Sequence, residues 1–176
     1  MTPRQNDYET RQAAFNEALM GQDELGAIIR AHIHIEHELI QFIEKHLKVP
    51  KALKDMQLDY NARIHLALAL GLKPSLSSPL KAVGTLRSAF AHKLGAILSE
   101  GKAKDFYKSF DAEGKRVLQQ AYNRTHQQLG TAKPPKVASL GPKDLCILCL
   151  VVIWAALIAA QPVEPSAVPA KEQSNK

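Results

Sequence analysis

The chain has 176 residues, of which 45% are hydrophobic and 6% aromatic, and it carries a net charge of +6 at pH 7. This length is sufficient for one domain of ordinary size with its own hydrophobic core. The first twelve residues, MTPRQNDYETRQ, are polar throughout, so we expect no secretory signal. Few aromatic residues and many Ala and Leu favour helices.

The excess of positive over negative charge is confined to one part of the chain. Residues 1–86 hold ten Lys or Arg and ten Asp or Glu, residues 87–143 hold eleven and four, and residues 144–176 hold two and three. A basic surface attracts phosphate polymers in a salt-dependent way, which predicts a nucleic-acid interface. The candidate residues are Lys93, Lys102, Lys104 and Lys108. A solvated basic face, or the cytoplasmic flank of a membrane helix, is the alternative.

Hydrophobic residues that recur every three to four positions predict helices along most of the chain. The expected helices cover residues 8–20, 24–47, 59–70, 79–94, about 105–129 with a break or bend at 111–114, and 145–160. No alternating strand pattern and no Asn-Gly or Asp-Gly hairpin signal appears. We therefore expect an all-α, antiparallel helical bundle formed by residues 1–160 as a single domain, followed by a disordered, Pro-rich tail over 161–176.

The helix over 79–94 has a strong start signal, because Ser78 can cap it and Pro79 occupies its first position. Gly95 is expected to close it. The segment SEGKAKD, residues 99–105, is expected to be a linker to the next helix.

The segment Leu145–Ala160 contains no polar residue. Its length as a helix, about 24 Å, is shorter than the roughly 30 Å hydrocarbon core of a bilayer. This favours a central helix of the bundle and a cytoplasmic protein, with a membrane anchor as the alternative. The pair Cys146 and Cys149 lies in this apolar run, and no second pair completes a zinc site, so we expect buried, inert thiols.

The helix over 79–94 carries Arg87 and His92 near its end. An Arg can hold a phosphate, and a His can take or give a proton near neutral pH. Together they are a minimal set of groups for RNA cleavage, so we predict Arg87 and His92 as catalytic residues. The alternative is a structural cation and a capping His at a helix end.

A His-rich stretch, residues 32–37, resembles a metal site at first sight. On a helix, His34, His37 and Glu38 would share a polar side, but no fourth ligand follows, so we predict no metal and no cofactor. Glu36 falls on an apolar stripe, where a carboxylate is costly unless it is paired. Arg63 or Arg87 is the expected partner in a buried ion pair.

Three segments occur together in an order that resembles the mannitol-operon repressor (MltR) family: AIIRAHIHIEHELIQFIEKHL, LDYNARIHLALALGLKPSL and LKAVGTLRSAFAHKL. The residues that carry the resemblance are Glu36, Arg63, Leu70-Gly71-Leu72, Arg87, Phe90, Ala91 and His92. It covers about residues 25–95. Ser88 stands where such sequences commonly have Asn or Asp, and its hydroxyl can still form a hydrogen bond.

The Arg-x4-His element is also similar to that of the HEPN superfamily of helical domains. This resemblance implies a metal-independent endoribonuclease whose site forms across a homodimer, with His92 acting on the ribose 2′-hydroxyl and Arg87 steadying the phosphate. These two catalytic side chains would then be held in position by Ser88, Glu36 and Arg63. The alternative is a non-catalytic regulator of the mannitol-repressor type that acts through a protein partner. No helix-turn-helix is recognisable.

Overall fold

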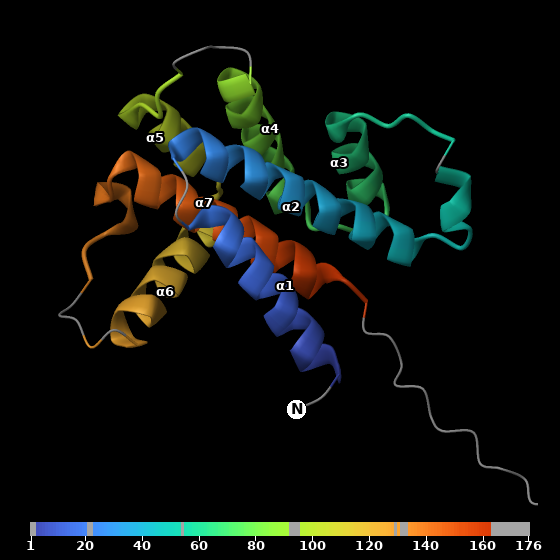
Figure 1. The fold of residues 1–176 in the computed structure, drawn as a ribbon, viewed down its shortest axis with the longest axis horizontal. Helices are drawn as coiled ribbons and strands as arrows, with labels where there is room; N and C mark the ends of the chain where they lie inside the picture. Colours follow the sequence, from blue (N-terminus) through green and yellow to red (C-terminus); the bar gives the residue numbers. More distant parts are fainter. Residues whose placement is uncertain are drawn as a thin grey trace, which may run out of the picture.

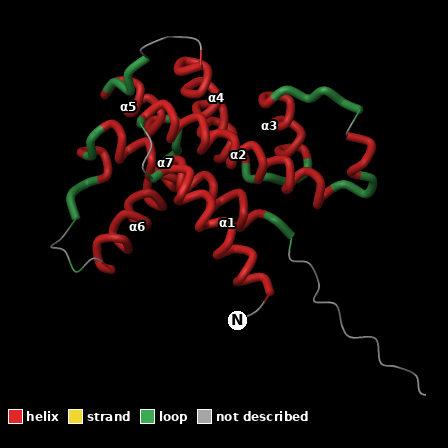
Figure 2. Tube along the Cα trace, viewed as in Figure 1, coloured by secondary structure: helices red, strands yellow, loops and turns green. Residues whose placement is uncertain are grey.

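The computed structural model describes residues 3–20, 23–53, 55–91, 96–128, 130 and 134–162. These residues form seven α-helices and three short 3-10 helices, with no strand among them (Figures 1 and 2). The elements are α1 (Pro3–Leu19), α2 (Glu24–His46), η1 (Pro50–Leu53), α3 (Tyr60–Ala69), η2 (Pro74–Leu76), α4 (Ser77–Ala91), α5 (Glu100–Lys108), α6 (Ala112–Gln128), η3 (Val137–Ser139) and α7 (Pro142–Ala160). The predicted all-helical class is confirmed. The predicted tail from residue 163 onward lies outside the described residues.

Local signals explain where most helices begin and end. The side chains of Asp23, Asp59, Ser99 and Asp111 accept hydrogen bonds from backbone N–H groups in the first turns of α2, α3, α5 and α6. Gly71 follows α3 with a φ of 101°, a left-handed conformation that glycine adopts without strain. These caps agree with the predicted helix boundaries to within a few residues for α2 and α3.

Three boundary predictions differ from the structure. α4 begins at Ser77, directly after η2, so Pro79 lies inside its first turn, where a missing N–H costs nothing. The predicted linker over 99–105 is wrong, because Ser99 caps a helix that starts at Glu100. The break predicted at 111–114 occurs slightly earlier, at residues 109–111, since α5 ends at Lys108 and α6 starts at Ala112. The expected closure at Gly95 lies outside the described residues.

The two longest helices, α2 and α7, lie side by side at the centre of the molecule (Figure 1). They run in the same direction, since Gln161 at the end of α7 contacts Lys45 near the end of α2, and Cys146 near the start of α7 lies close to Glu24. The predicted antiparallel arrangement is therefore wrong for this pair. The long connection between the two helices leaves their relative direction free, whereas α1 and α2, which follow each other closely in the sequence, are antiparallel.

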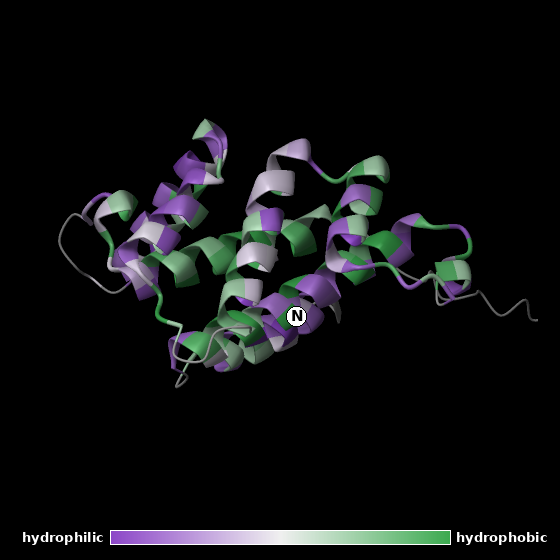
Figure 3. Cartoon of the chain, turned by 90° about the horizontal axis from the view of Figure 1, so that it is seen from above, coloured by the Kyte–Doolittle hydropathy of each residue, from purple (hydrophilic) through white to green (hydrophobic). Residues whose placement is uncertain are grey.

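All seven helices contribute to one continuous hydrophobic core. α3 and α4 pack against α2, while α5 and α6 pack against α7. Most of these outer helices show hydrophobic and hydrophilic residues side by side (Figure 3), as expected for helices that bury one face.

The apolar helix α7 is long and apolar enough to cross a membrane, a test that core helices of soluble proteins also pass. In this structure no residue from Leu145 to Ile158 is exposed. Trp154 is 1% exposed and stacks on Phe15 of α1, with ring centroids 4.9 Å apart. Cys146 and Cys149 are buried and unbridged, as predicted.

Candidate functional site

Arg87 lies in the last described turn of α4, where its side chain is exposed. Within the described part of the chain no carboxylate pairs with it. Ser88, the next residue, is also exposed. His92 and Lys93 lie outside the described residues, so the predicted approach of His92 to Arg87 stays a prediction. Arg87 thus presents a positive charge that no described carboxylate pairs with, five positions before His92 in the sequence.

A polar cluster lies behind Arg87, where α2, α3 and α4 meet. Arg63 Nη1 donates to Glu36 Oε1, which joins α3 to α2, so Arg63 is the one of the two expected partners that pairs with Glu36. The expected burial of this pair is wrong, because Glu36 is 26% and Arg63 28% exposed. His32 Nδ1 lies 3.8 Å from the other oxygen of Glu36. The His32 ring also packs on Tyr60, with centroids 4.6 Å apart. We call His32, Glu36, Tyr60 and Arg63 the α2–α3 cluster.

Tyr60 connects this cluster to α4. Its hydroxyl donates to the backbone carbonyl of Leu80 at 3.1 Å. A Cβ added at Gly84 would meet the Tyr60 ring at 3.0 Å, so any larger residue would push the ring or the helix away. Glycine at this position therefore allows α4 to pack closely on α3, which sets the position of Arg87 relative to the cluster.

The electrostatics of the cluster favour a neutral imidazole. Burial lowers the pKa of His32 below its usual value, Glu36 acts in the opposite direction, and the positive charge of Arg87 lowers it further. Burial, and then the charge of Glu36, raise the pKa of the Tyr60 hydroxyl well above its usual range. At pH 7 both groups are uncharged, and Arg87 acts electrostatically on the same cluster.

Glu38, two residues further along α2, is the more deeply buried carboxylate, at 2% exposed. Its oxygens accept hydrogen bonds from Arg11 of α1, with Nε at 3.1 Å, and from Gln161 Nε2 at 2.7 Å. Lys45 Nζ donates to Gln161 Oε1 at 2.9 Å. We call these four residues the Glu38 network.

Sequence reasoning placed Glu38 on a polar side with His34 and His37, and this placement is wrong. His34 packs its ring against Phe15, with centroids 5.6 Å apart, and His37 is exposed. The residues that the structure describes contain no group of three or more His, Cys, Asp or Glu able to hold a metal. The sequence did contain a signal for the burial of Glu38. It lies four residues before Phe42, which is buried, and residues four apart lie on the same face of a helix.

Two of the four lysines predicted to bind nucleic acid pair with carboxylates on α5. Lys104 pairs with Glu100 at 2.6 Å, and Lys108 pairs with Asp105 at 3.3 Å. Lys102 donates to the carbonyl of Ile97 at 2.9 Å, and its ammonium lies 5.1 Å from the Phe90 ring centroid. The ion pairs of Lys104 and Lys108 are exposed to solvent, so the attraction within each pair is weak.

No family model, no curated protein and no solved structure matches this chain. The resemblance to the mannitol-operon repressor and HEPN groups therefore remains a prediction.

Proposed function

We propose that this protein is an RNA-binding helical bundle that cleaves phosphodiester bonds without a metal ion, using Arg87 and His92. The observation that carries the proposal is the exposed, unpaired guanidinium of Arg87 in the residues described. An unpaired Arg at a surface is available to hold a phosphate in bidentate geometry. The predicted mannitol-repressor and HEPN resemblance supplies the reaction class.

In this reaction His92 removes the proton from a ribose 2′-hydroxyl, and the 2′-oxygen attacks the adjacent phosphorus. The bond from phosphorus to the 5′-oxygen breaks, and that oxygen takes a proton, which leaves a cyclic phosphate and a 5′-hydroxyl. Arg87 stabilises the negative charge that builds on the phosphate oxygens. We propose that a homodimer brings two such pairs together, so that one His92 acts as base and the other as acid.

The α2–α3 cluster supports Arg87 from behind in this proposal. The Glu36–Arg63 pair holds α2 against α3, and Gly84 lets α4 approach both. Ser88 can add a hydrogen bond beside the phosphate. Lys93, Lys102, Lys104 and Lys108 would extend the basic surface for RNA. The packing of α7 inside the bundle supports a cytoplasmic protein rather than one anchored through this helix.

The test uses the purified full chain, a panel of fluorescently labelled single-stranded RNAs, and EDTA. Cleavage should persist in EDTA and yield cyclic-phosphate ends. His92→Ala should reduce the rate by about 10²–10⁴-fold, and Arg87→Ala by about 10²–10³-fold. Arg124→Ala is the matched control, since Arg124 is also exposed but lies on α6. No cleavage of any RNA, or full activity with both alanines, would refute the enzyme.

A regulator that acts through a protein partner is the second candidate, and one observation favours it. Ile33 on α2 is 59% exposed, although the helical pattern predicted it to be in the core. It lies beside a hollow between α1 and α2, lined also by Ala14 and Arg30. If the RNA assays fail, Ile33→Ser should weaken partner binding while leaving the thermal midpoint within a few degrees.

A further inference from the structure

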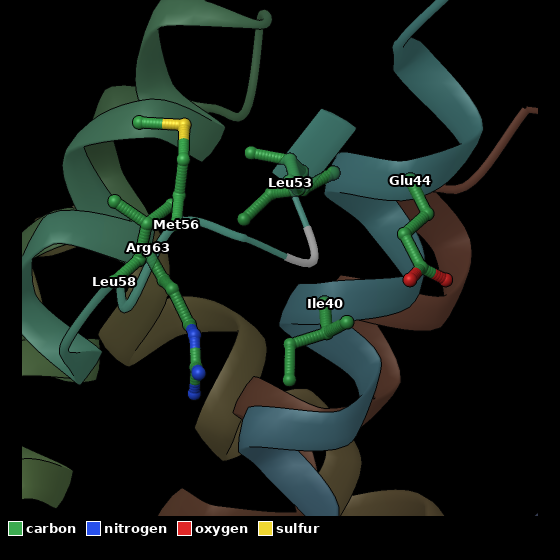
Figure 4. Close-up of a pocket in the computed structure, with 7 residues that line it drawn as sticks. Ile40, Glu44, Leu53, Met56, Leu58 and Arg63 are labelled. Atoms are coloured by element: carbon green, nitrogen blue, oxygen red, sulfur yellow. The ribbon is translucent and has the colours of Figure 1, made fainter. Parts of the chain in front are cut away.

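The first half of α2 carries an aliphatic stripe that is largely open to solvent in the part of the chain that the structure describes. Leu25, Ile29 and Ile33 are spaced four residues apart, so they lie along one side of the helix over about 12 Å. Leu25 is 39% and Ile33 59% exposed, and Ile29 is half-buried. Further along α2 the same side is partly covered, because Ile40 and Leu53 of η1 line one small cavity of about 100 Å³ (Figure 4). We call Leu25, Ile29 and Ile33 the α2 stripe.

One side of the α2 stripe faces α1. An open hollow of about 490 Å³ lies between α1 and α2, with Ile33 in its wall. Glu17 of α1 and Arg30 of α2 line the same hollow, and both side chains are exposed. No described residue forms an ion pair with either of them. The α1 side of the stripe therefore presents one negative and one positive charge beside an exposed isoleucine.

The other side of the α2 stripe faces α4 and the segment before α5. The positive charge of Arg87 acts on His32, whose ring packs against α3 and so lies away from α1. The backbone N–H of Leu98 donates to Glu24 Oε2 at 3.2 Å, which holds this segment at the start of α2. Ile97, the preceding residue, is 73% exposed. Arg87 and a further exposed aliphatic side chain therefore lie on the α4 side of the stripe.

We propose that the α2 stripe is the contact between two copies of this chain, related by a twofold axis that sets their α2 helices antiparallel. In this arrangement the same side of each copy meets, so Glu17 of one copy pairs with Arg30 of the other, and the reverse. A side that carries one acid and one base is complementary to itself, which selects a second copy as the occupant. A parallel pair would instead place the α1 side of one copy against the α4 side of the other.

The same symmetry brings the two α4 sides together. Arg87 of each copy then lies beside one common interface, together with the His92 that follows it in the sequence. The inference deepens the proposed function and rests on it, because that function requires a homodimer with two such pairs. A stable dimer buries about 800 Å² per partner, which is about 7% of the 11622 Å² surface of this chain. Burial on this scale extends beyond the stripe to Ile97 and to the charged side chains that face α1.

The first experiment measures the mass of the full chain by analytical ultracentrifugation. Interfaces of standard size have dissociation constants of about 1 µM or tighter, so the dimer should dominate at about 100 µM. Ile33→Lys should weaken dimerisation at least about tenfold, because it buries an unpaired charge at the contact. Val49→Lys is the matched control, since Val49 is 65% exposed and lies beyond the other end of α2, and it should dimerise as the wild type does.

Two outcomes of this experiment would overturn the proposal. One is a wild-type chain that stays monomeric at about 100 µM, which would leave the α2 stripe to a different protein partner. The other is a dimer that Ile33→Lys leaves intact while circular dichroism shows both variants folded, which would place the contact elsewhere.

The second experiment tests the antiparallel twofold arrangement by exchanging charges. Glu17→Lys alone and Arg30→Glu alone place like charges across the contact, so each should weaken its own dimer about fivefold or more. When the two variants are mixed, both contacts across the interface join opposite charges again, and a heterodimer should outnumber either homodimer in native mass spectrometry. An attraction within one chain is not restored by mixing, so a purely statistical mixture of dimers would refute the arrangement.

Both experiments use no RNA, so their results are separate from the test of the proposed activity. A dimer that responds as expected but cleaves no RNA would support the interface and refute the enzyme. Cleavage of RNA by a chain that stays monomeric would support the enzyme and refute the interface.

Discussion

Replacing the buried carboxylate of Glu38 should lower the stability of the protein by an amount that the structure lets us estimate. In Glu38→Gln the side-chain volume is kept, but the Arg11 guanidinium loses its buried counter-ion and keeps only the exposed Asp7, and one oxygen becomes an N–H donor that faces other donors. Removing one partner of a buried ion pair costs about 3–5 kcal/mol. Because the Arg11 side chain is 21% exposed, water recovers part of this, and we expect about 2–4 kcal/mol.

For a chain of this size, 1 kcal/mol lowers the thermal midpoint by about 2–4 °C, so Glu38→Gln should lower it by about 4–16 °C. The same substitution at Glu36 is the matched control, since Glu36 and Arg63 are 26% and 28% exposed, and it should cost about 1 kcal/mol. Urea unfolding followed by the fluorescence of Trp154, the single tryptophan, measures both free energies.

A double variant separates the buried charge from simple packing. Replacing both partners with apolar residues, in Arg11→Met with Glu38→Leu, should recover most of the stability that Glu38→Gln loses. If Glu36→Gln costs as much as Glu38→Gln, or the double variant is no better than the single one, the reasoning about burial is wrong.

Three further predictions concern the histidines, the cysteines and α7. Burial lowers the pKa values of His32 and His34, so between the folded and unfolded pKa values the unfolded chain binds more protons. The free energy of unfolding should therefore fall as pH drops below about 6.5, by at most about 1.4 kcal/mol per pH unit for each histidine, and His32→Gln should flatten this slope in urea titrations. Burial raises the pKa of Cys146 to about 12 and that of Cys149 further, so a thiol reagent should label neither in the native protein and both in urea; rapid native labelling would contradict this. The protein should fractionate as soluble, with Trp154 shielded from iodide and acrylamide, and retention by carbonate-washed membranes would contradict the central packing of α7.

The helix positions and one ion pair were predictable from the sequence because they depend on near neighbours. Caps such as Asp59, and the stop at Gly71, act on the first or last turn of their own helix. Arg63 was one of two partners predicted for Glu36, because a carboxylate on an apolar stripe requires a cation and α3 is the next α-helix after α2, with only η1 between them. The position of His92 relative to Arg87, which the proposed activity requires, lies outside the described residues.

The tertiary structure alone decided which faces of α2 are buried. This helix is covered by α1, α3, α4 and α7 together, so no single apolar stripe separates inside from outside. Two residues that are only five apart went against the pattern: Ile33 is 59% exposed, and Glu38 is 2% exposed. The reason is physical, since Glu38 is buried only because Arg11 and Gln161, far away in the sequence, satisfy its charge and hydrogen bonds once α1 and α7 have docked.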